Sequence, residues 1–168
     1  MTTDIAEDIQ AQFRDAMASV AAPVSIMTSY QDGIPYGTTV SAFSSLSMDP
    51  PMVLACLDRR SKLLAPIRAT GTFALNVLGT DHHRLVRSFA SREGDRFAGV
   101  EWRLQHGVPQ LQGVLSWIGC DVESLIAAGD HVVVIGLVRQ VINRTGSPLT
   151  YYSRSLGTHT DLSELQAA

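Results

Sequence analysis

Apolar residues near the start of the chain recur every three or four positions, which is the spacing of an α-helix. This pattern predicts an amphipathic helix over residues 4–20. The repeating positions are Ile5, Ile9, Phe13, Met17 and Val20. Pro23 follows the end of this pattern and separates it from what comes next.

From residue 24 onward the period of apolar positions falls to two, which is the period of a β-strand. Residues 24–30 form the first such run, and Asp32-Gly33 is a dipeptide typical of a two-residue hairpin turn. Residues 35–43 are therefore predicted to return as the second strand. A loop is predicted over residues 44–51, which end in two prolines.

Most of the remaining chain also reads as strand. Further strands are predicted over residues 52–57, 73–78, 114–122, 131–142 and 148–152. Helices are predicted from Leu64 to the terminating Gly71 and over 81–90, whereas residues 91–113 read as irregular. Many strands at short intervals with few helices between them predict a mainly β fold, built as an antiparallel sheet or barrel.

Composition and charge narrow the function class. With 168 residues, 45% hydrophobic and 17% charged, the chain is expected to be one globular domain over residues 1–168, with the barrel over about 24–152 and a polar tail over 153–168. A net charge of −3 argues against nucleic acid as a partner. We expect a cytoplasmic protein without membrane segments, because the start of the chain lacks a signal peptide and Cys56 and Cys120 suit a reducing compartment.

Small hydroxyl residues are crowded into the segment between two predicted strands. Ser41, Ser44, Ser45 and Ser47 alternate with apolar residues there. Small side chains allow a planar ligand to approach the backbone, and hydroxyl and amide groups supply hydrogen bonds. The alternative is a serine-rich turn whose hydroxyls bind their own backbone.

Two further groups of residues could bind a ligand. The run Arg59-Arg60-Ser61-Lys62 precedes a predicted helix, where cations and backbone amides favour an anion, although the same run also fits a solvated basic turn. Asp130-His131 opens an apolar strand, so that His131 stands either at the rim of a pocket, oriented by Asp130, or in solvent at a strand end.

Several common site types are not indicated by the sequence. His82 and His83 are adjacent and would point in different directions on a helix, so no metal site is expected. The chain has no Gly-x-Ser-x-Gly motif of a serine hydrolase, no Rossmann glycine motif and no P-loop. A nucleotide cofactor would therefore be held by some other kind of unit.

Four motifs occur in the order and spacing of a known family. They are Thr-Val-Ser-Ala-Phe-Ser-Ser-Leu-Ser-Met-Asp-Pro-Pro at 39–51, Gly-Thr-Phe-Ala-Leu-Asn-Val-Leu at 71–78, Asp-Arg-Phe-Ala-Gly at 95–99 and Gly-Asp-His at 129–131. From about residue 13 to residue 152 the chain resembles the short-chain flavin reductases, the reductase components of two-component flavin-dependent monooxygenases. The resemblance implies a split β-barrel of Greek-key type and a homodimer with flavin near the subunit interface.

The resemblance also implies a set of site residues. Hydroxyl-segment residues would contact the isoalloxazine and ribityl groups, the end of the next strand would lie along the flavin, and the basic turn would hold its phosphate. A helix end would meet the flavin, and His131, as the catalytic-site histidine, would contact the nicotinamide nucleotide. In chain order the residues are Thr38, Thr39, Ser41, Ala42, Cys56, Leu57, Asp58, Ser61, Lys62, Ser88, Phe89, Arg96, Asp130, His131 and Tyr152.

The activity implied is hydride transfer from NADH, or NADPH, to FMN or FAD, with the reduced flavin passed to a partner monooxygenase. The cofactors supply the reactive atoms, so such an enzyme needs no nucleophile and no strong general base. Two alternatives remain open on the sequence: a flavin-binding module without turnover, and a different flavin-dependent oxidase on the same barrel. An oxidase acting on a phosphorylated amine would want a second basic cluster, which the sequence does not show.

Overall fold

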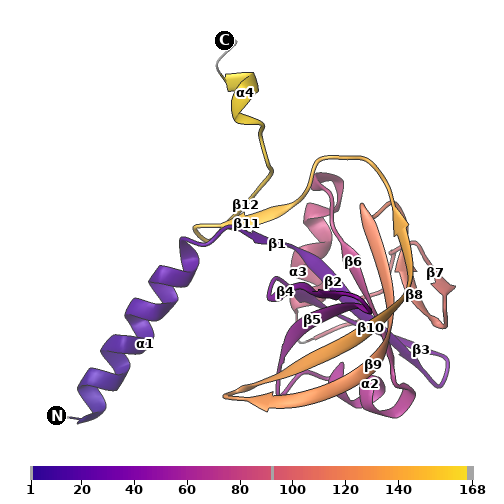
Figure 1. Ribbon diagram of the computed structural model, residues 1–168, viewed down its shortest axis with the longest axis horizontal. Coiled ribbons are helices and arrows are strands. Elements are labelled where there is room, and N and C mark those ends of the chain that lie inside the picture. The colour runs from indigo at the N-terminus through magenta and orange to yellow at the C-terminus, as the bar shows by residue number, and fades with distance from the viewer. Residues whose placement is uncertain (1, 92, 166–168) are drawn as a thin grey trace.

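Seven antiparallel strands form one curved sheet that dominates the computed structural model (Figure 1). The structure describes residues 2–91 and 93–165. In sheet order the strands are β3 (Ile34–Val40), β2 (Ser25–Gln31), β6 (Thr72–Val77), β9 (Ser116–Ala128), β10 (His131–Asn143), β5 (Pro51–Asp58) and β4 (Phe43–Met48). Each neighbouring pair is antiparallel, which confirms the mainly β prediction.

Smaller elements surround this sheet. One hairpin pairs β7 (Trp102–Gln105) with β8 (Val108–Leu111), and a three-stranded sheet contains β1 (Ala22–Pro23), β11 (Thr150–Tyr152) and β12 (Ser155–Gly157). The helices are α1 (Thr2–Ala18), α2 (Leu64–Thr70), the short 3-10 helix η1 (Thr80–His82), α3 (His83–Ala90) and α4 (Leu162–Leu165).

The predicted hairpin turn and the predicted end of the second helix are both present in the structure. Asp32 and Gly33 have φ angles of 52° and 82°, and the flanking residues Gln31 and Ile34 are paired, so a two-residue hairpin joins β2 to β3. Helix α2 begins at Leu64, and Gly71 ends it in the left-handed conformation with φ 68°.

Three segments differ from the predictions. The predicted loop over 44–51 contains most of β4, the predicted irregular segment 91–113 contains β7 and β8, and the polar tail contains β12 and α4. Strand β4 was missed because it is a sheet edge whose serines are mostly exposed, so it lacks the apolar alternation of a half-buried strand. The other missed elements are only three or four residues long.

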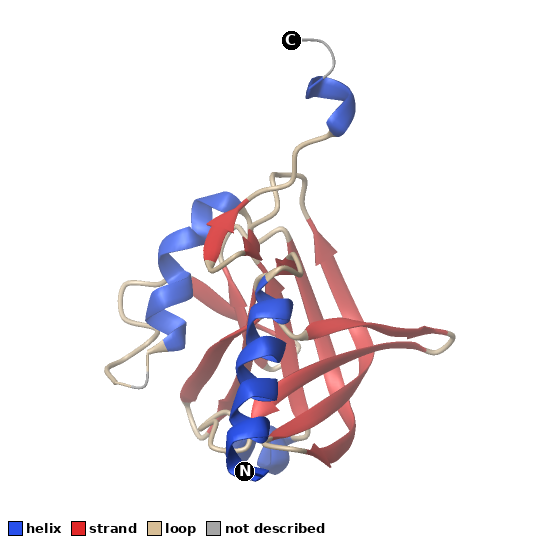
Figure 2. Ribbon diagram, turned by 90° about the vertical axis from the view of Figure 1, so that its left-hand side faces the viewer, coloured by secondary structure: helices blue, strands red, loops and turns tan. Residues whose placement is uncertain are grey.

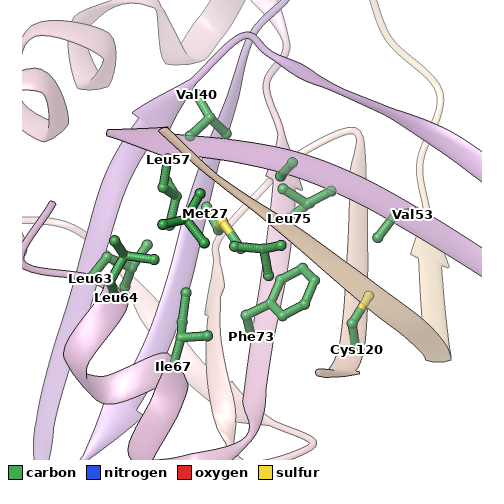
Figure 3. Close-up of a cluster of buried hydrophobic side chains, with 13 residues drawn as sticks. Met27, Val40, Val53, Leu57, Leu63, Leu64, Ile67, Phe73, Leu75 and Cys120 are labelled. Atoms are coloured by element: carbon green, nitrogen blue, oxygen red, sulfur yellow. The ribbon is translucent and has the colours of Figure 1, made fainter. Parts of the chain in front are cut away.

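Two hydrophobic clusters hold the fold together. Figure 3 shows the first, in which Met27, Phe73 and Leu75 of the sheet face Ile67 of α2. The second joins the other side of the sheet to α3 and the β7–β8 hairpin around the fully buried Trp117 and Phe89. The first cluster fixes α2 behind the turn after β5, and the second fixes α3 together with Phe97 of the segment before β7.

Helix α1 stands away from the barrel in Figure 1, and α4 lies on a segment that leaves the barrel in both views (Figures 1 and 2). The helix predicted over residues 4–20 is therefore present with slightly different bounds, but its apolar face is not covered by its own barrel: Ile9 is 61% exposed and Phe13 is 65% exposed. Its described links to the chain include an ion pair from Arg154 to Asp15. Among the described residues, no helix combines the length and apolarity needed to cross a membrane.

Candidate active site

A cavity of about 510 Å³ is lined by the ends of β3 and β5. Its volume falls within the range of about 300–1,000 Å³ that is usual for small-molecule sites. The lining residues come from the two strand ends, the turn after β5, the end of α3, the loop before β7 and the start of β10. They are Thr38, Thr39, Val40, Ser41, Ala42, Cys56, Leu57, Asp58, Arg60, Ser61, Lys62, Ala90, Arg96 and His131.

Strand β3 presents backbone groups to this cavity because it is an edge of the sheet. Among the described strands it pairs with β2 alone, which leaves alternate N–H and C=O groups without a strand partner on its other side. The Gly37 carbonyl faces that side, since it accepts a hydrogen bond from Nη1 of Arg96. Thr39 is two residues further along, so its N–H and C=O face the same side as those of Gly37.

The threonine hydroxyls fix the strand to α3 and do not face the cavity as free donors. Oγ1 of Thr39 donates to the Val86 carbonyl at 2.9 Å, and Oγ1 of Thr38 donates to the Phe89 carbonyl at 3.4 Å. At Gly37 an added Cβ would lie 2.7 Å from Cε1 of Phe89, so only glycine allows this close packing. The polar groups that β3 can offer a ligand are thus mainly its backbone amides and carbonyls.

The basic turn carries less free charge than its sequence indicates. Arg60 forms a two-pronged ion pair with Asp58, with Nε–Oδ1 and Nη2–Oδ2 distances of 3.0 and 2.7 Å. Hydrogen bonds from Arg60 hold the pKa of the Asp58 carboxyl well below its usual range. The two charges cancel locally, and Arg59 does not line the cavity, so neither arginine acts as the free cation expected from the sequence.

Two other cations remain at the cavity wall, Lys62 and Arg96. Among the described residues, no carboxylate oxygen lies within 4.0 Å of either charged group. Lys62 is exposed, whereas Arg96 is partly buried, and desolvation lowers the pKa of its guanidinium. A partly desolvated cation without a carboxylate partner favours an anionic ligand, and guanidinium and ammonium groups bind phosphate well.

His131 stands at the rim with its ring held by a carboxylate. It is the first residue of β10 and pairs with Asp58 on β5. Its Nδ1 lies 2.7 Å from Oδ1 of Asp130, and this hydrogen bond lowers the pKa of the Asp130 carboxyl. An ionised carboxylate only accepts, so Nδ1 carries the proton and Nε2 is the nitrogen left for a ligand.

Four of the predicted site residues do not line the cavity. Phe89 is completely buried in the second core cluster, Ser88 is exposed on α3, and Asp130 acts on the site through His131. Tyr152 belongs to β11 of the small sheet. The contact from α3 is made by Ala90, one position beyond Phe89, because neighbouring residues on a helix point in different directions.

Val40, Arg60 and Ala90 line the cavity without having been predicted. Arg60 belongs to the basic run 59–62 that was predicted as a possible anion site, but its role as a partner of Asp58 has no local sequence signal. Within the described residues, no cluster of three or more His, Cys, Asp or Glu side chains is placed to hold a metal ion.

Comparison with known proteins agrees with this arrangement of elements. A family model for the flavin reductase-like domain matches residues 17–160. The chain belongs to the flavin reductase-like family. The family match covers every element that contributes to the cavity, from β3 to β10.

Two relatives of the chain are named for different activities. The chain is 38% identical over 148 residues to the actinorhodin polyketide dimerase of Streptomyces coelicolor. The aligned region covers 86% of this chain and 84% of that protein. It is also 38% identical to the reductase component of a 4-nitrophenol monooxygenase from Rhodococcus opacus, over 88% of this chain and 80% of the relative.

A solved structure shows the same fold with ligands of both expected kinds. The NADH:FAD oxidoreductase of Streptomyces globisporus, in complex with NAD and FAD fragments, matches with a TM-score of 0.86 and 25% identity, over 92% of this chain and 94% of the other. The expected split β-barrel of the flavin reductase-like family is thereby confirmed.

Proposed function

We propose that this flavin reductase-like protein transfers hydride from NADH to FMN or FAD and supplies the reduced flavin to a separate monooxygenase. The observation that carries the proposal is the composition of the cavity wall. An edge strand offers backbone hydrogen bonds, the end of β5 offers the partly exposed Cys56, and the wall also carries Lys62 and Arg96, neither of which has a carboxylate partner among the described residues. These are the groups that a planar, phosphorylated heterocycle requires.

The residues that line the cavity match the chemical groups of a flavin. Thr39 would meet the polar edge of the ring system through its backbone, and Lys62 and Arg96 would hold the phosphate. Cys56 and the backbone of Leu57 would lie against the ring, since the Leu57 side chain is buried in the first core cluster. A bound flavin supplies the hydride-accepting ring. The protein binds both reactants and orients them, which is sufficient for catalysis when the reacting atoms are held in near-attack geometry.

His131 provides the second half of the site. Its Nε2 is left for a ligand at the cavity wall, where it can accept a hydrogen bond from the nicotinamide nucleotide. Asp130 fixes the ring orientation, and the Asp58–Arg60 pair borders it on the neighbouring strand. Stacking of the nicotinamide over the flavin would then close the cavity to water.

The deciding experiment follows NADH oxidation by the purified protein, with no flavin, FMN, FAD or riboflavin added. Oxidation that depends on added flavin is expected, and NADPH in the same assay tests the choice of donor. Flavin binding without oxidation of either nucleotide would instead identify a binding module. Oxygen uptake with a phosphorylated amine and bound flavin, in the absence of NADH, would identify an oxidase.

Replacing Lys62 with alanine should weaken FMN binding by about tenfold while riboflavin binding changes little, because a hydrogen bond to a charged group contributes about 1.5–3 kcal/mol. Titration of flavin fluorescence measures both affinities. Arg68→Ala is the matched control, since Arg68 is an exposed cation of α2 that does not line the cavity. An equal loss for FMN and riboflavin in Lys62→Ala would show that Lys62 does not touch the phosphate.

We also propose a homodimer in the cytoplasm. The apolar face of α1 is exposed at Ile9, Phe13 and Met17, and a second copy of the chain would cover it. Light scattering should give twice the chain mass, and Phe13→Glu should shift the mass toward the monomer; a monomeric wild type would refute the dimer.

Both cysteines are free, and burial raises the pKa of the Cys120 thiol to about 12, which fits a reducing compartment.

A further inference from the structure

A second cavity of about 150 Å³ adjoins the first and is not used by the flavin ring or its first phosphate as placed above. We infer that this cavity receives the adenosine end of FAD, which makes FAD the preferred flavin. The inference rests on the proposed function, since it extends the same flavin site. It decides between FMN and FAD, a choice that the sequence and the cavity of about 510 Å³ leave open.

The two cavities meet at a pair of cations. Lys62 and Arg96 line both of them, and no other residue is shared. Nη1 of Arg96 is fixed on the Gly37 carbonyl, which leaves its remaining N–H groups for other acceptors. FMN carries one phosphate, whereas FAD carries two linked phosphates. Two cations at the junction therefore suit a pyrophosphate that passes from one cavity to the other.

The wall of the second cavity suits an aromatic base. Tyr36 of β3 contributes a ring that is partly buried against the first core cluster, so it is held in place. A space of about 150 Å³ admits a ring the size of benzene, which is enough for one ring of a purine to insert while the other stays at the surface. Bases stack on such aromatic side chains whatever their identity.

A hydrogen-bond acceptor completes the second cavity. Asp95 lines it, and Oδ1 of Asp95 accepts a hydrogen bond from the Phe97 backbone N–H at 2.9 Å. This bond fixes the carboxylate and leaves Oδ2 to accept from a ribose hydroxyl or the adenine amino group. Stacking and hydrogen bonding would thus act on the half of FAD that FMN lacks.

The ADP half of NADH has the same chemistry and is the competing occupant. The structure favours FAD because Lys62, which is proposed to hold the flavin phosphate, also opens into the second cavity. The group attached to that phosphate is then the one that reaches Tyr36. His131, proposed to hold the nicotinamide nucleotide, does not line the second cavity.

The test compares FAD with FMN by fluorescence titration of the wild type, Tyr36→Leu and Tyr36→Phe, without NADH present. We expect the wild type to bind FAD about tenfold more tightly than FMN, and Tyr36→Leu to lose about that factor for FAD alone. Tyr36→Phe keeps the stacking ring and should behave as the wild type. An FMN affinity retained by Tyr36→Leu shows at the same time that the variant is folded.

Three results would overturn the inference. The first is a wild type that binds FMN as tightly as FAD. The second is an equal loss of affinity for FAD and for FMN in Tyr36→Leu. A raised KM for NADH in Tyr36→Leu, with FMN as acceptor and an unchanged ratio of flavin affinities, would assign the cavity to NADH. Failure of the proposed function looks different: the wild type would bind flavin but oxidise no NADH, whatever the ratio of affinities.

Discussion

Replacing His131 with alanine should raise the KM for NADH by about tenfold and leave the KM for flavin within about twofold, because the lost hydrogen bond belongs to nucleotide binding alone. The ring is held at the rim by the 2.7 Å contact between Nδ1 and Asp130, so its Nε2 has a fixed position before the nucleotide arrives. Steady-state kinetics with each substrate varied in turn separate the two constants.

The control for this variant is His159→Ala, which removes an exposed histidine of the C-terminal segment that does not line the cavity. It should change neither KM. Asp130→Asn tests the positioning role: its amide still accepts from Nδ1 but no longer carries a charge, so an intermediate rise in the KM for NADH is expected. Equal rises in the KM for NADH and for flavin in His131→Ala would contradict the assignment.

The parts of the site that the sequence could predict are those with local signals. Of the predicted hydroxyl-rich run only Ser41 lines the cavity, whereas Ser44, Ser45 and Ser47 lie in the edge strand β4. The turn from Asp58 to Lys62, apart from Arg59, and the strand start at His131 line the same cavity, as their motifs indicated. Each motif combines a break in the apolar pattern with residues that a turn or strand end requires. Their meeting point follows from the sheet. β5 lies beside β10, and only Ser41 and Ala42 separate β3 from β4 along the chain although these strands are the two edges of the sheet.

The parts that could not be predicted depend on contacts between distant segments. The sequence does not show that Arg60 turns back onto Asp58, because a solvated arginine and a paired arginine look alike in a basic run. Nor does it show which residue of α3 faces the cavity. The rotation of that helix is set by burial of Phe89 beside Phe97, at a ring separation of 5.0 Å. Both features concern side-chain direction and leave the position of the cavity unchanged.

Asn76, in the core, is another residue whose role the sequence alone does not show. The sequence places an amide in the middle of a buried strand, within the run from Gly71 to Leu78 that helped to identify the family, but it gives no reason for the residue. In the structure Asn76 is completely buried, and its Oδ1 accepts from the Leu111 backbone N–H at 2.8 Å. Its Nδ2 donates to the Ile26 carbonyl and to Oγ1 of Thr28, both at 3.1 Å.

This amide therefore attaches the β7–β8 hairpin to the sheet. Oγ1 of Thr28 and Nε1 of Trp117 both donate to the Pro109 carbonyl, which also lies within reach of the Asn76 amide. Backbone groups buried this deeply have no water to replace a lost partner. The Asn76 side chain thus provides hydrogen bonds to buried polar groups of the sheet and the hairpin, which no apolar residue of similar size could provide.

Replacing Asn76 with alanine should accordingly lower the free energy of unfolding by about 3 kcal/mol, since the Leu111 N–H and the Ile26 carbonyl lose a buried partner. The melting temperature should fall by about 10 °C for a chain of this size. Urea denaturation followed by circular dichroism measures the change.

Asn143→Ala is the control, because Asn143 is an exposed asparagine that accepts one hydrogen bond from Ser116. Its loss should cost less than about 0.5 kcal/mol. A loss in Asn76→Ala no larger than in this control would mean that the hairpin is held by its apolar contacts alone.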